Sequence, residues 1–318
     1  SWLSHMLFAH SPMYTSMPCR SRAWSITGGY RRRNASSSSD SGIGRIPAID
    51  QIWKRFTRIS ARISTYAFHS CTLHVRSASR VGHSHGGETA LGALDEQFRH
   101  AVTKLAHLHL TSCAAYRRRV IQMGEDPARV LDVGALGVEN ARTVEPLDRA
   151  ELAGSLDFDL DRPFLLATYH PVTMAHDAPE QAAAFFRGLR AALDERADLA
   201  AVLTGANADP GGKGVDALSA ALAQELPGRV LVTPSLGLVR YLSAMRLCAA
   251  VVGNSSSGIL EAPSFGVPTV NVGERQAGRI RAESVIDCAP DALAVQDAIR
   301  RALSEEGAAI AKRASNPY

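Results

Sequence analysis

A serine-rich turn in the C-terminal half of the sequence has the residue types of a phosphate-binding site. Ser255, Ser256 and Ser257 precede Gly258, and the apolar run 248–252 comes before them. A buried strand, a Ser/Gly turn and a helix would place backbone N–H groups, hydroxyls and the positive end of a helix dipole at one point, where an anion binds. The sequence therefore predicts a phosphate cradle here. A serine-capped helix without a ligand is the alternative.

The glutamate that follows this turn is predicted to bind a ribose. Glu261 lies four residues after Ser257, one position too far for a capping box, so its carboxylate is left to accept hydrogen bonds from another group. A ribose diol beside the phosphates is the natural candidate, and a solvated surface glutamate is the alternative. Gly266 and Pro268 end a helix of about two turns, and 269–272 forms the next strand.

Polar residues also follow the other predicted strands of this half. His170 comes after the strand 163–168, and Asn207 and Ser235 follow the next two strands. Because the carboxyl ends of parallel strands meet at one edge of a sheet, we expect these side chains and the serines on one rim. There His170 would donate to a phosphate oxygen and stabilise a departing diphosphate. A structural histidine and an ordinary turn after Asn207 are the alternatives.

Charged residues in two further segments are candidates for chemistry. Arg275, Arg279 and Arg281 follow a strand and would pair with an anion, stack on a base or form a solvated face. Glu88 and Asp95 are two carboxylates at a loop–helix junction. Facing a cleft, they would share acid and base work, with burial or mutual repulsion raising one pKa; otherwise they are surface charges.

The elements that carry these residues predict an α/β fold. From residue 163 onward short apolar strands alternate with helices, which is typical of a parallel sheet with helices on both faces. After a Gly-containing loop at 83–88 there is only one β-α-β-type unit, which is followed by the loop 134–137, and the polar, acidic segment 141–161 is the expected connection between domains. The predicted strands are 107–111, 129–133, 163–168, 199–203, 230–232, 248–252 and 269–272, and the predicted helices are 92–105, 113–123, 179–193, 212–224, 238–245 and 291–303.

Composition limits the class of protein. A chain of 318 residues is long enough for two domains. No apolar run approaches the ~18 residues needed to cross a bilayer, so we expect no membrane partner. The five cysteines are scattered without a CxxC pair, which favours reduced thiols in a cytoplasmic protein and no metal site.

The segment 1–80 differs from the rest of the chain. It holds 12 of the 35 Lys and Arg residues and two acidic residues, whereas the remainder holds 23 basic and 29 acidic residues. The folded part is therefore acidic, and we expect no nucleic-acid partner. Low-complexity Ser- and Arg-rich sequence of this kind is typical of a transit peptide or a basic tail. We favour a third interpretation, a leader that is non-native or disordered, because the statistics change abruptly near Gly82.

Several stretches match the motifs of a known family in the same order. They are HSHGGET (83–89), RHAVTKL (99–105), YRRRVIQMGE (116–125), VGALG (133–137), GNSSSG (253–258), EAPSFG (261–266) and RQAGR (275–279). Over roughly two thirds of its length the chain resembles the UDP-N-acetylglucosamine 2-epimerases, specifically the hydrolysing branch that serves nonulosonic (sialic and legionaminic) acid biosynthesis.

The resemblance implies a glycosyltransferase-B type fold of two Rossmann-like domains, the N-terminal one incomplete. It implies a leader (1–80), a remnant of the N-terminal domain (81–145), a UDP-binding C-terminal domain (146–305) and a tail (306–318). It also implies that UDP is bound by Ser255, Ser256, Ser257, Gly258, Glu261, Arg275 and Asn207, and that Glu88, Asp95, His85 and His170 are catalytic.

In such enzymes a base removes the proton at carbon 2 of the sugar while UDP leaves from carbon 1. Water then adds to the glycal, which releases N-acetylmannosamine, and no metal or cofactor is required. The family's N-terminal domain begins with a Gly-rich, Arg-bearing strand–turn and supplies an Asp ahead of the His-Gly-Gly-Glu loop. Residues 1–80 contain neither, so we expect this chain to bind UDP weakly and to turn over no substrate.

Three alternatives stay open. The first is the same chemistry on a 2,4-diacetamido-2,4,6-trideoxy UDP- or GDP-sugar, for legionaminic acid. The second is a glycosyltransferase of the same fold, and the third is a nucleotide-binding remnant without activity. The expected partner is a nucleotide sugar, and a homo-oligomer is compatible with the sequence.

Overall fold

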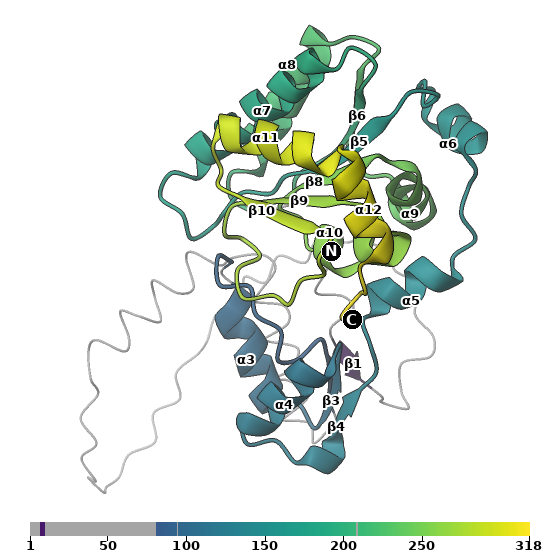
Figure 1. The fold of residues 1–318 in the computed structure, drawn as a ribbon. Coiled ribbons are helices and arrows are strands. Elements are labelled where there is room, and N and C mark those ends of the chain that lie inside the picture. The colour runs from purple at the N-terminus through teal and green to yellow at the C-terminus, as the bar shows by residue number, and fades with distance from the viewer. Residues whose placement is uncertain (1–6, 10–80, 94, 208) are drawn as a thin grey trace, which may run out of the picture.

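The computed structural model describes residues 7–9, 81–93, 95–207 and 209–318, with 7–9 described as backbone only. The prediction of a non-native or disordered leader over 1–80 therefore lies outside the described residues, apart from that short backbone segment. The described residues form two β-sheets with helices packed on them, one above the other in Figure 1.

The larger sheet belongs to the C-terminal half and contains six parallel strands in the order β10-β9-β8-β5-β6-β7. Its first strand in the sequence, β5, lies inside the sheet between β6 and β8. The strand order therefore reverses between β5 and β8, and open α/β sheets bind ligands in the crevice at such a reversal. The strands are β5 (Phe164–Thr168), β6 (Ala200–Thr204), β7 (Val230–Thr233), β8 (Ala250–Gly253), β9 (Thr269–Val272) and β10 (Val285–Cys288).

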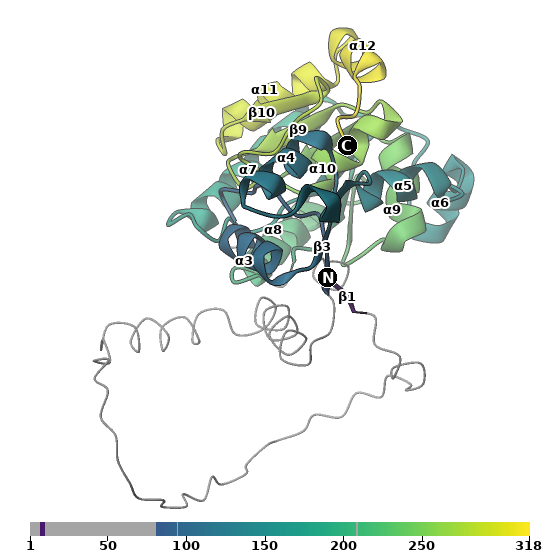
Figure 2. The ribbon, with the colours of Figure 1, turned by 90° about the horizontal axis from the view of Figure 1, so that it is seen from below.

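Helices cover both faces of this sheet because alternate residues of each strand point to opposite faces. Leu165 and Ala167 of β5 pack against the layer of α7, α8 and α11, whereas Phe164 and Leu166 pack against α6, α9 and the 3-10 helix η3. Figures 1 and 2 show α7 and α11 on one side of the molecule and α6 and α9 on the other. These helices are α6 (Arg149–Leu156), α7 (Ala178–Glu195), α8 (Gly212–Glu225), α9 (Gly237–Leu247), η3 (Ala262–Phe265) and α11 (Ala292–Ala302).

The smaller sheet has the strand order β1-β2-β3-β4. β2, β3 and β4 are parallel, and β1 pairs antiparallel with β2. β2 includes His83 and Ser84, which the sequence analysis placed in a loop. The elements are β1 (Leu7–Ala9), β2 (Val81–Ser84), α3 (Asp95–Leu105), β3 (Leu108–Thr111), α4 (Ala114–Gln122), η2 (Pro127–Arg129) and β4 (Val130–Asp132), and the remaining helices are α5 (Leu136–Thr143), α10 (Ser257–Leu260) and α12 (Glu305–Arg313).

A separate apolar cluster joins the two halves. Tyr116 of α4 packs there with Val138 of α5, Ile259 of α10 and Tyr318. The Tyr318 hydroxyl donates to the Ile280 carbonyl at 2.8 Å and lies 3.1 Å from the Tyr116 hydroxyl. The Ile280 N–H in turn donates to the Tyr116 hydroxyl at 3.1 Å. The last residue of the chain therefore helps to fix one half against the other.

Several elements occupy segments where the sequence predicted none. α5 and α6 lie in the predicted loop 134–137 and connection 141–161, β10 follows the arginine run, and α12 lies mostly within the predicted tail 306–318. α6 is defined by a capping box in which Asp148 and Glu151 each bind the other's backbone N–H. None of the helices within the described ranges is long and apolar enough to cross a membrane.

Candidate functional site

A cavity of about 290 Å³ lies at the carboxyl ends of β5 and β6, next to the strand-order reversal. Its lining includes five residues that the sequence analysis expected at this edge: His170, Ser235, Ser255, Ser257 and Glu261. The others are Thr168, Thr204, Gly205, Pro234, Leu236, Gly237 and Tyr241. Four other predicted ligand residues are not in its lining, namely Ser256, Gly258, Asn207 and Arg275. The structure thus brings the histidine, two of the three serines and the glutamate to one cavity.

The serine turn begins at a glycine that no other residue can replace. Gly253 has φ 134°, and a Cβ at this position would lie 1.9 Å from the carbonyl oxygen of Thr168. The hydroxyl of Ser257 is 3.0 Å from that of Ser255 and 2.5 Å from that of Tyr241. The helix after the turn has one α-helical turn, α10, and continues as η3 instead of the two α-helical turns expected. The hydroxyls and backbone N–H groups are therefore the stronger argument for an anion site, because the helix dipole is short.

His170 is held as a neutral imidazole that can donate a hydrogen bond. The backbone N–H of Asn207 donates to its Nδ1 at 3.1 Å, which places the ring proton on Nε2. Burial, assisted by the nearby Arg275 guanidinium, lowers the pKa of His170 to about 3. At neutral pH this ring therefore offers an uncharged Nε2–H donor to the cavity.

The buried side chain of Asn254 ties His170 to the serine turn. Its Oδ1 accepts from the His170 backbone N–H at 2.7 Å, and its Nδ2 donates to the His170 carbonyl at 2.8 Å. These bonds bridge the ends of β5 and β8, on either side of the strand-order reversal. Arg275 lies beside them, donating to the Asn254 carbonyl at 3.4 Å and approaching Asp209 at 3.8 Å. Asn207 donates to Asp209 at 2.5 Å, and its own Oδ1 is buried without a hydrogen-bond partner.

Glu261 keeps a carboxylate oxygen buried and unpaired. The residue is 9% exposed, and its Oε2 has no hydrogen-bond partner. Burial raises the pKa of Glu261 to about 7. The carboxyl group lies against Gly137 in the first turn of α5. An acceptor held in this way is suited to a ligand hydroxyl, and its assignment to a ribose stays a prediction.

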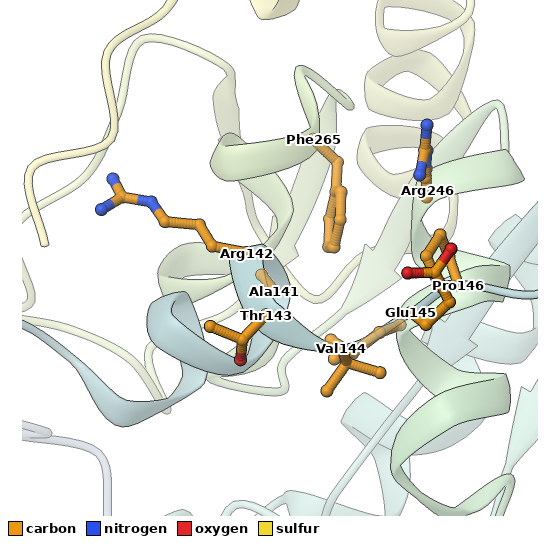
Figure 3. A pocket seen from close by; sticks show the side chains of 9 residues that line it. Ala141, Arg142, Thr143, Val144, Glu145, Pro146, Arg246 and Phe265 are labelled. Carbon is orange, nitrogen blue, oxygen red and sulfur yellow. The ribbon is translucent and has the colours of Figure 1, made fainter.

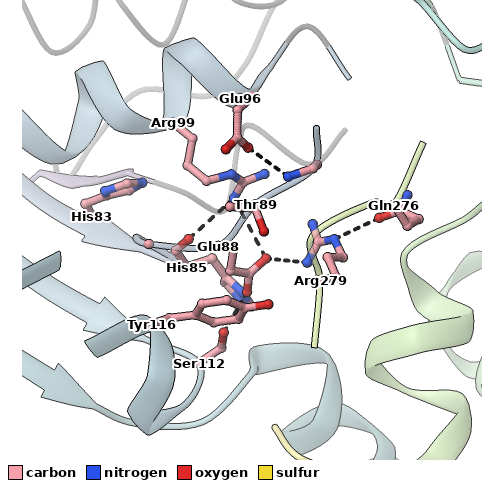
Figure 4. Close-up of polar contacts among 12 residues, drawn as sticks. His83, His85, Glu88, Thr89, Glu96, Arg99, Ser112, Tyr116, Gln276 and Arg279 are labelled. Atoms are coloured by element: carbon pink, nitrogen blue, oxygen red, sulfur yellow. Dashed lines mark hydrogen bonds and ion pairs between the residues drawn. The ribbon is translucent and has the colours of Figure 1, made fainter. Parts of the chain in front are cut away.

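Glu88 occupies a second polar centre between the two halves (Figure 4). Its Oε1 accepts from Ser112 Oγ at 2.6 Å and lies 2.6 Å from His85 Nδ1. Its Oε2 accepts from Arg279 Nη1 at 2.5 Å, and Arg99 Nη1 is 3.9 Å away. Arg279 comes from the loop after β9, so an ion pair buried on both sides joins the C-terminal half to the N-terminal one.

The sequence predicts that burial or mutual repulsion raises one pKa of the Glu88–Asp95 pair, but Glu88 is not the residue whose pKa is raised. Burial alone would raise it, but the Arg279 guanidinium and the His85 hydrogen bond hold the pKa of Glu88 well below its ordinary value. The carboxyl group whose pKa is raised is that of Glu261. Asp95 is the first residue of α3, and its side chain lies outside what the structure describes.

His85 belongs to this centre and directly follows β2. Its backbone is left-handed, with φ 61°, a conformation that costs a residue other than glycine about 1 kcal/mol. The Glu88 carboxylate, 2.6 Å from Nδ1, fixes the orientation of the imidazole ring. Neither feature is visible in the sequence, since both depend on contacts across the fold.

A further cavity of about 300 Å³ lies beside the segment between α5 and α6 (Figure 3). None of the predicted site residues lines it. Its polar lining residues include Glu145 and Arg246, and Arg142 extends away from them (Figure 3). Within the described ranges no group of three or more His, Cys, Asp or Glu side chains is arranged to hold a metal ion.

Comparison with known proteins identifies the family. The family profile described as UDP-N-acetylglucosamine 2-epimerase matches residues 67–318. A GDP/UDP-N,N'-diacetylbacillosamine 2-epimerase (hydrolyzing) from Campylobacter jejuni is 35% identical over 205 residues, which are 64% of this chain and 53% of that protein. The polysialic acid biosynthesis protein P7 of Escherichia coli is 35% identical over 243 residues, 74% of this chain and 59% of that protein. The chain thus spans between half and two thirds of the length of these relatives.

Solved structures agree on the fold. The UDP-GlcNAc 2-epimerase of Neisseria meningitidis bound to UDP-GlcNAc superposes with a TM-score of 0.65 at 14% identity, covering 86% of this chain and 76% of that one. A UDP co-structure of MnaA from S. aureus gives 0.64 at 20% identity, covering 79% of this chain and 68% of that one. The predicted glycosyltransferase-B type α/β fold is thereby confirmed. With the family profile matching most of its length, the chain belongs to the UDP-N-acetylglucosamine 2-epimerase family.

Proposed function

We propose that this chain carries the nucleotide site of a hydrolysing UDP-N-acetylglucosamine 2-epimerase, which eliminates UDP and hydrates the glycal to N-acetylmannosamine for sialic or other nonulosonic acid biosynthesis. The observation that carries the proposal is the single cavity lined by His170, Ser255, Ser257 and Glu261. It offers neutral donors for a diphosphate and a buried acceptor for a ribose. The free thiols of the described cysteines are compatible with a cytoplasmic enzyme.

The leaving group departs on the C-terminal side of the site. As the bond from carbon 1 to the diphosphate oxygen breaks, negative charge develops on UDP. The Nε2–H of His170 and the hydroxyls of the serine turn, which line the same cavity, would donate to that charge. Arg275, next to Asn254, adds a positive charge near the phosphates. Glu261 would hold the ribose hydroxyls through its unpaired Oε2.

The proton is removed on the N-terminal side. His85 lies with its Nδ1 2.6 Å from the Glu88 carboxylate, the arrangement of a general base oriented by a carboxylate, and we assign the base role to it. The base takes the proton from carbon 2, and the electron pair of that bond forms the double bond of the glycal. Water then adds across the double bond, with hydroxyl at carbon 1 and a proton at carbon 2. Glu88 orients the imidazole and stays ionised, and Asp95 is retained as a candidate acid.

A second candidate is the same elimination from a 2,4-diacetamido-2,4,6-trideoxy sugar carried by UDP or GDP, for legionaminic acid. The name of the Campylobacter jejuni relative, a hydrolysing diacetylbacillosamine 2-epimerase, favours it. The two candidates differ only at the sugar, so the nucleotide contacts above serve either one. A glycosyltransferase of the same fold and a nucleotide-binding remnant without turnover are the remaining alternatives.

Calorimetric titration with UDP, followed by proton NMR of incubations with each sugar nucleotide, tests the proposal. We expect UDP to bind the wild-type chain and the control Ser155→Ala, whose serine is on α6, and to bind Ser255→Ala at least about tenfold more weakly. Turnover would appear as equal amounts of UDP and N-acetylmannosamine, or of the diacetamido epimer. Binding without consumption would select the remnant, and absence of UDP binding would refute the site.

A further inference from the structure

The loop 273–281 between β9 and β10, called the bridging loop here, contacts the N-terminal half through its backbone. The Leu91 N–H donates to the Ala277 carbonyl at 3.0 Å, and the Thr89 hydroxyl donates to the Gly278 carbonyl at 2.6 Å. The fit is tight, because a Cβ on Gly278 would lie 2.7 Å from Thr89 Oγ1. These contacts fix the loop against the segment that carries His85 and Glu88.

Inside this loop one buried amide joins the two polar centres. Gln276 is 2% exposed. Its Nε2 donates to the carbonyl of Asn254 at 2.9 Å, and its Oε1 accepts from Arg279 Nε at 2.7 Å. Arg279 then reaches Glu88, as Figure 4 shows. A continuous path of hydrogen bonds thus runs from Glu88 through Arg279 and Gln276 to Asn254, which holds the backbone of His170.

We propose that Gln276 is a positioning residue that couples occupancy of the nucleotide site to the geometry of the Glu88–His85 pair. The inference rests on the proposed function, since it takes UDP as the ligand of the serine turn. A ligand that orders the turn at Asn254 fixes the Gln276 amide, which fixes the Arg279 guanidinium on the carboxylate. Coupling of this kind is reciprocal, so an ordered Glu88 centre also favours UDP binding.

The chemistry of the side chain explains why an amide is needed at this position. The Asn254 carbonyl requires a donor and the Arg279 guanidinium requires an acceptor, and a primary amide offers both on adjacent atoms. Gln276→Met keeps the length of the side chain but breaks both bonds. Gln276→Glu keeps the acceptor for Arg279 and loses the donor to Asn254, so it removes only the hydrogen bond between residue 276 and the Asn254 carbonyl. Gln296→Met, on the surface of α11, is the matched control.

Hydrogen–deuterium exchange with and without UDP measures the coupling. In the wild-type protein and Gln296→Met, we expect UDP to slow exchange both in the serine turn (253–258) and in the segment 85–93, the latter by about fivefold or more. In Gln276→Met and Gln276→Glu, the serine turn should still respond to UDP, while the response of 85–93 should largely disappear. If Gln276→Met does not fold, Gln276→Glu alone tests the coupling. Where turnover is measurable, kcat should fall in both variants by a larger factor than KM rises.

Two results would overturn the inference in distinguishable ways. Equal UDP-dependent protection of 85–93 in the wild type and both variants would show that Gln276 transmits nothing, while the proposed function stands. No response of 253–258 to UDP in the wild-type protein would refute the proposed function itself, and the coupling with it.

Discussion

A methyl group placed on Gly137 would lie 2.0 Å from the Oε1 atom of Glu261. The two residues are more than a hundred positions apart, and they meet because α5 crosses from the smaller sheet to the larger one beside α10. The carboxyl group proposed to hold the ribose can therefore occupy its position only because residue 137 has no side chain.

Gly137→Ala should displace Glu261 and weaken UDP binding. Overpacking at a buried contact also costs about 1–3 kcal/mol of stability, which chemical denaturation would measure alongside calorimetry. The matched control is Gly154→Ala on α6, where a new Cβ would meet nothing within 4 Å. There we expect unchanged UDP affinity and a gain of about 0.5–1 kcal/mol, since alanine is the better helix former. Normal UDP affinity in Gly137→Ala would contradict the assignment of Glu261.

Glu261→Gln should stabilise the unliganded protein at high pH and weaken nucleotide binding. The folded pKa of about 7 lies above the ordinary value, so the protonated form is favoured in the fold. Stability from this group is fully present below pH ~4.5 and is lost as the pH rises through 7, by up to about 3 kcal/mol. Unfolding midpoints at pH 8 should therefore be higher for the glutamine variant than for the wild type, and nearly equal at pH 4.5. If the glutamine variant is no more stable than the wild type at pH 8, burial does not disfavour the charged form of this carboxyl group.

Acid should destabilise the protein through His170 and His83. Burial is the main cause of the lowered pKa of each, which is about 3, so both stay neutral in the fold while the unfolded chain takes up protons below pH 6.5. The stability held above pH 6.5 falls as the pH falls, by roughly 2 kcal/mol per histidine at pH 5. Protonation of Glu261 stabilises the protein over the same pH range, so the contribution of one histidine is measured by comparing a variant of that histidine with the wild type.

His83→Asn isolates one of these contributions. In the wild type, His83 Nδ1 lies 3.2 Å from Thr103 Oγ1, and the Oδ1 atom of an asparagine side chain can occupy the position of that nitrogen. Between pH 7 and 5 the unfolding free energy of this variant should fall by about 2 kcal/mol less than that of the wild type. Parallel curves for the two proteins would show that His83 titrates normally.

Removing one partner of the Glu88–Arg279 ion pair should lower the free energy of unfolding far more than replacing both partners with uncharged residues. Arg279→Met leaves a buried carboxylate without its main partner, and we expect a loss of about 3–5 kcal/mol. Glu88→Gln combined with Arg279→Met removes both charges and should be less destabilised than the sum of the single variants. A double-mutant cycle by urea unfolding measures the difference. Additive effects would mean that the pair contributes no coupling between the two halves.

Much of the larger sheet was predictable because its strands are short apolar runs between clear helices. Residues 164–168 and 250–253 have that form, and the edge-of-sheet argument then placed His170 and Ser255 together. β10 has no such run, since Val285–Cys288 is only partly buried and contains Asp287. The domain boundaries stay a prediction.

Other parts of the structure depend on contacts that no local pattern contains. α6 was the exception, because the spacing of Asp148 and Glu151 is a capping signal that was available in the sequence. Asn254, Gln276 and Gly137 matter through partners elsewhere in the chain, 84 residues away in the case of Asn254 and His170. Their roles became visible only with the fold, although all three lie within recognised motifs.

The position of β5 inside its sheet has a consequence for biosynthesis. Among the strands of the larger sheet, β5, β6 and β7 leave the ribosome first and can pair with one another, but the other edge of β5 stays unpaired until β8 is made, more than eighty residues later. Until then the nascent chain exposes an unpaired, strongly apolar strand edge of the kind that misassociates with other chains. Slow elongation between residues 205 and 250 would lengthen that interval, so yield should depend on codon usage there and on holdase chaperones.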